Sequence, residues 1–125
     1  MNQATQFRRD LHQIPETSFT EFKTREYVVS VLKTLHCELI ELLETGVAAY
    51  FDAGRPATLA YRADMDALPI QEETGLEFAS RHPGKMHACG HDGHMAMLLG
   101  FAQELDQLDR SGWKNNCLLY TSDAA

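Results

Sequence analysis

Apolar residues recur at steps of three and four in three parts of the chain, the period of an amphipathic helix facing a core. The first predicted helix covers residues 2–13 and ends before a proline, which disfavours helical backbone at the preceding residue. The second follows 18-SFTE-21, which has the form of a capping box, and continues to about His36. The third follows 92-DG-93 and continues to about Leu108. The three stripes are Phe7, Leu11, Ile14; Val28, Val31, Leu32, Leu35; and Met95, Leu98, Leu99, Ala102, Leu105, Leu108.

Between the second and third helices the pattern changes to short apolar runs separated by a glycine and a turn-rich segment. Residues 39–43, 47–51 and 58–63 predict two or three strands, of which the last two are expected to form a hairpin. Residues 64–83 contain Pro and Gly and little periodicity, so they are predicted to be mostly loop. This order predicts an α/β fold with helices packed on an incomplete sheet.

The length and net charge of the chain exclude some classes of function. A chain of 125 residues has the size of one domain, and its net charge of −7 includes no basic cluster. Nucleic acid and anionic membranes bind through Lys and Arg patches, so neither is expected as a partner, and a small molecule is. No 18-residue apolar run or leader is visible, and three unevenly spaced cysteines do not suggest disulfides. The chain is therefore expected to be soluble and cytoplasmic.

The last nine residues, CLLYTSDAA, resemble the translation of a transposase-type sequencing adapter. If the resemblance holds, residues 117–125 are read-through, and the natural sequence breaks off near Asn116. Residues 1–116 are then a truncated reading frame.

The densest cluster of metal-binding residue types lies at the start of the third predicted helix. Cys89 and His91 suit zinc or another late first-row divalent ion, and His87 and His94 flank them. Asp92 lies at the start of the helix, where free backbone N–H groups can bind an anion. The alternative is that the cysteine is a small buried apolar group and the histidine is a hydrogen-bonded core residue.

A pair of carboxylates follows the predicted strand over residues 58–63. Asp64 and Asp66 share a face if the backbone stays extended, so both would project from the carboxyl end of the strand. Alternatively, one of them caps a turn and the other is solvated. Only about 23 residues separate the two constellations, so together they suggest a carboxylate that orients the metal ligands. A zinc knuckle would need a second nearby cysteine, which is absent.

These motifs resemble a known family. RADMDALP and HPGKMHACGHDGHMAMLLG, with RRDLHQIPE near the start, are similar to the metal-dependent amidohydrolases that include N-acyl-amino-acid amidohydrolases, hippurate hydrolase and N-acetyldiaminopimelate deacetylase. The resemblance implies a zinc-peptidase-like catalytic domain, with Cys89 and His91 as ligands of a two-metal centre and Asp66 as the aspartate that orients it. The metals would be Zn, Mn, Co or Ni. Asp64 is at a position where relatives have a ligand histidine. Together with His87, Asp92 and His94, it would lie next to the metal ligands without binding the metal itself.

The resemblance also implies what this chain lacks. In the family, a Glu-Glu pair beyond the third helix supplies the general base, and two histidine ligands and a lid domain follow; none of these is present here. The fragment is therefore expected to be inactive, whereas its full-length parent would hydrolyse an N-acyl amino acid and could dimerise through the lid. LHQIPE and LAYRADMDALPI look more like N-acetyldiaminopimelate deacetylase than hippurate-type members. The alternatives are a broader N-acyl-amino-acid or hippurate hydrolase and a standalone metal-binding module.

Overall fold

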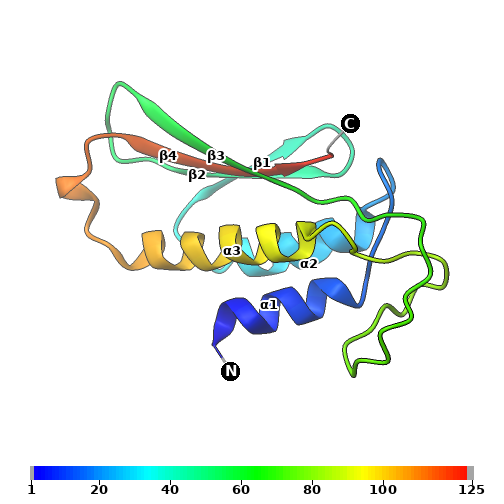
Figure 1. The fold of residues 1–125 in the computed structure, drawn as a ribbon. Helices are drawn as coiled ribbons and strands as arrows, with labels where there is room; N and C mark the ends of the chain where they lie inside the picture. The colour runs from blue at the N-terminus through cyan, green and yellow to red at the C-terminus, as the bar shows by residue number, and fades with distance from the viewer. Residues whose placement is uncertain (1, 124–125) are drawn as a thin grey trace.

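Three helices lie on one face of a four-stranded sheet in the computed structural model, which describes residues 2–123 (Figure 1). The predicted α/β class with a mixed sheet is confirmed, and each helix ends within a few residues of its expected bounds. The helices are α1 (Gln3–His12), α2 (Phe22–Leu32) and α3 (His91–Gln107); the strands are β1 (Glu38–Leu42), β2 (Gly46–Phe51), β3 (Thr58–Asp64) and β4 (Asn116–Ser122); and a short 3-10 helix covers Arg110–Gly112.

The strand order is β1-β2-β4-β3, so the expected hairpin between β2 and β3 is wrong. β4 lies between them, antiparallel to β2 and parallel to β3. A parallel pair needs a crossover, and α3 provides it between β3 and β4. The hairpin is instead formed by β1 and β2, whose register pairs Leu42 with Gly46. A side chain at Gly46 would meet the carbonyl oxygens of Thr121 and Leu42 at 2.7 and 2.9 Å, so a residue without Cβ is required there.

Residues 117–122, which the adapter resemblance sets apart from the fold, complete β4 at the centre of the sheet. Cys117, Leu119 and Thr121 are buried, and the residues between them are less so, which is the alternation expected of a strand with one face on a core. Their pattern is therefore compatible with a central strand, whatever their origin. That origin stays a prediction.

The start of α2 differs from the predicted capping box. Helix α2 begins at Phe22, and its N-cap, Glu21, makes no side-chain cap bond. The carboxylate of Glu16 caps the helix instead, because it accepts from the backbone N–H groups of Lys23 at 3.1 Å and Thr24 at 2.7 Å. A negative charge at this end of a helix is favoured by the helix dipole. The hydroxyl of Ser18 is therefore not needed for the cap and can bond to another group.

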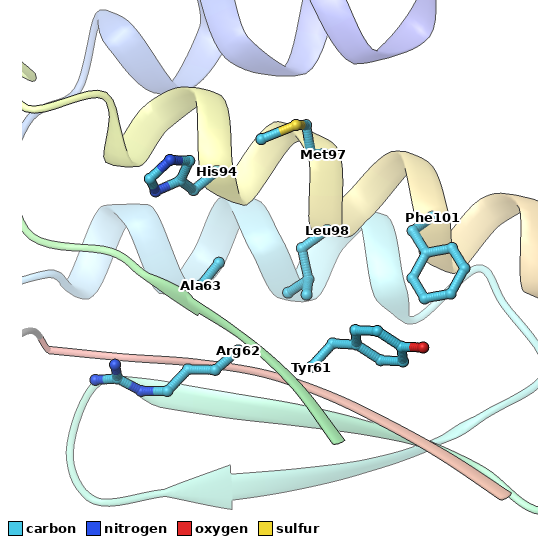
Figure 2. Close-up of a pocket in the computed structure, with 7 residues that line it drawn as sticks. All are labelled: Tyr61, Arg62, Ala63, His94, Met97, Leu98 and Phe101. Carbon is cyan, nitrogen blue, oxygen red and sulfur yellow. The ribbon is translucent and has the colours of Figure 1, made fainter. Parts of the chain in front are cut away.

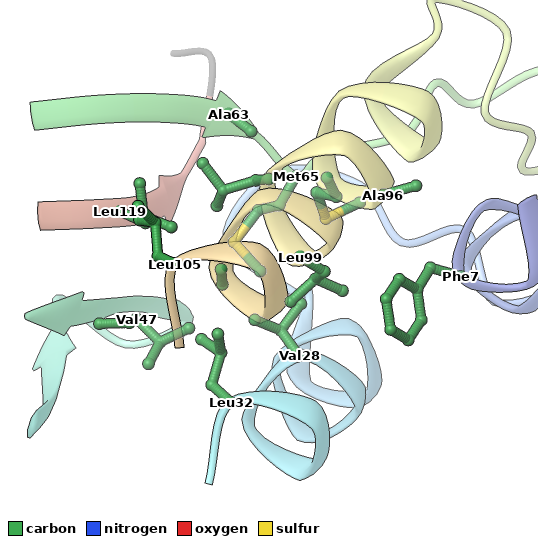
Figure 3. Packing of buried hydrophobic residues seen from close by; sticks show 14 of the residues in the cluster. Phe7, Val28, Leu32, Val47, Ala63, Met65, Ala96, Leu99, Leu105 and Leu119 are labelled. Carbon is green, nitrogen blue, oxygen red and sulfur yellow. The ribbon is translucent and has the colours of Figure 1, made fainter. Parts of the chain in front are cut away.

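The core lies between the helix layer and the sheet (Figure 3). Leu99 on α3 is fully buried there, with Phe7 of α1, Val28 of α2 and Leu119 of β4 in the same cluster. The stripes of α2 and α3 therefore meet the inner face of the sheet, whereas the stripe of α1 packs against α3. No helix within residues 2–123 is long and apolar enough to cross a membrane.

Packing around Leu99 gives a first prediction. Leu99→Ala should lower the free energy of unfolding by about 2–5 kcal/mol, because it removes buried methyl groups and leaves a cavity. Met97→Ala, two residues away on the exposed side of α3, should change it by less than about 0.5 kcal/mol. Denaturant titration of both variants measures the difference, and equal losses would contradict the packing described.

The free edge of β3 gives a second prediction. Leu59 and Tyr61 are 50% and 44% exposed on this edge strand, and a strand edge with apolar side chains promotes association. We expect the purified chain to self-associate, and the double variant L59K/Y61K to shift it towards monomer. The matched control E38K/I40K changes the opposite edge strand, where Glu38 already supplies a charge. Light scattering after size exclusion measures the mass; a monomeric parent chain would contradict the prediction.

Candidate metal centre

The ring of His91 lies between two carboxylates, those of Asp64 at the end of β3 and Asp66 just beyond it. Its Nδ1 is 3.3 Å from Oδ1 of Asp66, and its Nε2 is 3.7 Å from Oδ2 of Asp64. Asp64 ends β3 and His91 opens α3, so the contact joins the carboxyl end of a strand to the amino end of a helix. The predicted convergence of the two aspartates on the Cys/His segment is therefore present for His91.

Hydrogen bonding leaves one nitrogen of His91 directed towards Asp64. Nδ1 is 2.9 Å from the backbone oxygen of Asp66, and as an N–H group it donates to that carbonyl, which places the lone pair on Nε2. Histidines that bind metals usually donate from the second nitrogen in this way. The 3.7 Å between Nε2 and Asp64 is long for a hydrogen bond but close to the roughly 3.4 Å that separates two ligands of one tetrahedral zinc. The spacing is compatible with a divalent metal beside Nε2 of His91, while Oδ1 of Asp64 pairs with Nη1 of Arg62 at 2.7 Å.

Asp66 is held from a second direction by the loop before α2. The hydroxyl of Ser18 donates to Oδ2 of Asp66 at 3.1 Å, while Oδ1 faces His91. The next residue, Phe19, has a positive φ of 65°, and its N–H donates to both carboxylate oxygens of Asp123 at 3.2 Å. The sequence pattern assigned Ser18 to a helix cap, so this contact was missed.

Cys89 is exposed in the turn that precedes α3. Gly90 follows it with a φ of 99°, a conformation that favours glycine, and this glycine is the N-cap of the helix. Within residues 2–123, no group of three or more His, Cys, Asp or Glu side chains is arranged to hold a metal ion. The structure thus brings together His91, Asp64 and Asp66, and the role of Cys89 stays a prediction.

Two of the residues predicted to lie just outside the ligands, His87 and Asp92, are buried behind this cluster. His87 is 4% exposed, and neither ring nitrogen has a hydrogen-bond partner in the described structure. Burial lowers the pKa of His87 to about 4, so the ring is neutral at pH 7; nearby His12 and His91 act in the same direction, and Asp92 and Asp66 oppose them. The neutral ring of His87 therefore has one nitrogen that can donate a hydrogen bond and one that can accept, and neither is engaged in the described structure.

Asp92 belongs to a second buried cluster, which sequence reasoning did not identify. Its Oδ2 is 2.8 Å from Nδ1 of His12 and accepts from Nε of Arg8 at 3.0 Å. The other ring nitrogen of His12 is 3.0 Å from Oε1 of Glu72, in the loop expected to be irregular. His12 lies within the RRDLHQIPE motif, but helical periodicity marks only its apolar neighbours.

His94 lies one helical turn beyond His91, with the two ring centroids 6.0 Å apart. Its side chain is exposed at one end of a surface groove of about 420 Å³ between α3 and β3 (Figure 2). Tyr61 of β3 and Phe101 of α3 meet edge to face, with centroids 5.1 Å apart. The groove is mainly apolar and opens at the free edge of the sheet.

Known proteins resemble this chain over most of its length. Residues 60–123, from β3 through β4, match the family described as Peptidase family M20/M25/M40. The chain belongs to this family. It is 55% identical to an N-acetyldiaminopimelate deacetylase of Leuconostoc citreum over 107 residues, 81% of this chain and 28% of that protein. It is 54% identical to an N-acyl-L-amino acid amidohydrolase of Geobacillus stearothermophilus over 104 residues, 82% of this chain and 28% of that protein.

A solved member of the M20 family has the same fold over this region. The Bacillus subtilis YXEP protein, described as a dinuclear metal-binding peptidase, superposes with a TM-score of 0.90 and 41% sequence identity. The match covers 97% of this chain and 35% of that protein. The chain therefore spans between a quarter and about a third of the length of these relatives. The predicted family and catalytic-domain fold are confirmed.

The contact between Ser18 and Asp66 gives a third prediction. Ser18→Ala should lower the free energy of unfolding by about 1 kcal/mol, because it removes a partly buried hydrogen bond to a carboxylate. Ser30→Ala is the matched control, since its hydroxyl donates only to an exposed backbone oxygen of α2, and it should cost less than about 0.5 kcal/mol. Urea titration measures both changes. A cost at Ser18 no larger than that at Ser30 would contradict the role assigned to Ser18.

Proposed function

We propose that this chain is the N-terminal part of the catalytic domain of a two-metal amidohydrolase that hydrolyses N-acyl amino acids. The observation that carries the proposal is the placement of His91 between Asp64 and Asp66, with Nδ1 bonded to a backbone oxygen and Nε2 free to bind a metal. Relatives named for amide hydrolysis support the reaction class. The description of YXEP as dinuclear supports two metal ions, without indicating which metal.

Each residue of the cluster has a proposed role. Cys89 and His91 would bind metal, because a thiolate and an imidazole suit late first-row divalent ions. Asp66 would orient His91 through Nδ1, and Ser18 would hold the carboxylate of Asp66 in place. Bound divalent ions would supply Lewis acidity towards the amide carbonyl and a water molecule. The general base lies outside this chain in the proposal, so the chain alone should not hydrolyse amides.

For the substrate, we propose an N-acetylated amino acid, with N-acetyldiaminopimelate as the first choice. Relatives from Leuconostoc, Listeria, Bacillus and Anoxybacillus, at 48% to 55% identity, carry the N-acetyldiaminopimelate deacetylase name, which supports this choice. A broader N-acyl-amino-acid hydrolase is the second candidate, because the Geobacillus relative is as similar, at 54% identity. The parent would act in the cytoplasm on this small molecule, and it could be a homodimer.

A standalone metal-binding module is the competing proposal from another class. It would require the side chains of this chain to complete a ligand set, whereas residues 2–123 contain no preformed group of three candidate ligands. A partial site binds metal weakly, because the missing ligands reduce both affinity and folding energy. The two proposals therefore differ in the metal affinity of the purified chain.

Metal titration gives the fourth prediction. The purified chain should bind Zn²⁺ or Co²⁺ weakly, and Cys89→Ala should remove the thiolate-to-cobalt charge-transfer band. Cys37→Ala is the matched control, since Cys37 packs against the core cluster and its thiol reaches the backbone oxygen of Leu32; it should leave the band intact. Absorption spectroscopy during Co²⁺ titration measures both. Tight, stoichiometric zinc lost on Cys89→Ala would favour the module, and a cobalt band that survives Cys89→Ala would contradict the ligand assignment.

A further inference from the structure

We propose that His12 is a positioning residue for the metal centre, because it connects the loop between Asp66 and Cys89 to the first turn of α3. The inference rests on the proposed function, since the parts that it aligns are the proposed metal ligands. His12 itself ends α1, and its two ring nitrogens face Asp92 and Glu72. Its effect on the centre would therefore be indirect.

The geometry places one imidazole ring between two buried carboxylates. Nδ1 of His12 is 2.8 Å from Oδ2 of Asp92, and Nε2 is 3.0 Å from Oε1 of Glu72. The side chains of all three residues are 2% exposed. Buried carboxylates are retained in proteins when they are paired, and the ring is a partner that both of them share. Arg8 adds a second partner on the Asp92 side.

The two carboxylates belong to the two halves of the proposed centre. Asp92 directly follows His91 in α3, so a fixed Asp92 fixes the first turn from which His91 projects. Glu72 lies in the loop that begins after Asp66 and ends at Cys89, where it also accepts from the backbone N–H of Ser80 at 2.9 Å. His12 is thus a direct connection between helix and loop.

The loop is bound to α1 by further contacts around the same ring. Phe78 meets His12 edge to face at 5.7 Å, and the guanidinium of Arg9 lies 4.7 Å from the centre of the Phe78 ring. Within the loop, Leu68 and Met86 exchange two backbone hydrogen bonds of 3.0 Å, just inside Asp66 and Cys89. These two amides report whether the loop keeps its shape.

Amide hydrogen exchange at Leu68 and Met86 is the primary test. In the purified chain, His12→Ala should raise both exchange rates by at least about tenfold, because it leaves two buried carboxylates without the group between them. His12→Asn and His12→Gln should each restore part of the protection, since their amide N–H groups replace Nδ1 and Nε2 respectively. His12→Leu, which refills the space without an N–H donor, should rescue less than either amide; rescue by Leu equal to theirs would show that the ring only fills space.

Two controls separate positioning from general loss of stability. His36→Ala removes a histidine whose Nδ1 is 3.1 Å from Asp106 but whose ring is 88% exposed, and it should leave both rates unchanged. Leu32→Ala destabilises the core from α2 without touching this cluster. At matched global stability, faster exchange of Leu68 and Met86 in His12→Ala than in Leu32→Ala supports the inference. Equal rates in these two variants would overturn it.

Cobalt titration of the same variants links the loop to the centre. His12→Ala should weaken Co²⁺ binding by roughly 10–100-fold relative to the parent chain, as expected when a group that orients ligands is lost. Equal Co²⁺ affinity in His12→Ala and His36→Ala would overturn the positioning role. If the parent chain shows no cobalt band at all, the proposed metal centre fails for this chain, and the exchange rates alone decide whether His12 holds the loop.

Discussion

The contact of His91 with Asp64 and Asp66 is the interaction that ties the fold of this chain to its candidate site, and the rest of the site is arranged around it. It joins the end of β3 to the start of α3, the two elements whose crossover also places β4 at the centre of the sheet. The strand ends with the carboxylate of Asp64, that of Asp66 follows two residues later, and the helix supplies an imidazole at its first residue. The same junction therefore organises the fold and assembles the candidate site.

Local periodicity was sufficient to predict the helices and the inner face of the core. The stripes of α1, α2 and α3 bury Phe7, Val28 and Leu99 as expected, because helical spacing depends only on neighbouring residues. Strand pairing was not predictable in the same way. β2 pairs with β4, about 70 residues further along the chain, and no local pattern near β2 indicates a partner at that separation. The predicted cap of α2 was wrong for a different reason, because the capping carboxylate comes from Glu16, outside the S-x-x-E pattern, and not from Ser18.

The candidate site likewise has residues that the sequence predicts and residues that it does not. Asp64, Asp66 and His91 could be grouped from the sequence, because a strand end and a helix start lie close together in an α/β fold. His12 and Glu72 could not, since their contacts join α1 to a loop without periodicity and to a helix 80 residues away. The His12 cluster is recognised because its charged side chains are buried. Their burial can be seen only once the helices, strands and loop are packed together. Cys89 stays a prediction from the motif, exposed in its turn before Gly90.

The central claim is that these residues are part of a longer two-metal amidohydrolase, and one measurement tests it directly. The source locus should be sequenced through and beyond the codon for Asn116. The account predicts that the natural frame continues from that codon into a Glu-Glu pair and later histidines, without CLLYTSDAA. A natural gene that ends in CLLYTSDAA would contradict it, and MHACGHDGH would then be a partial metal site with another purpose.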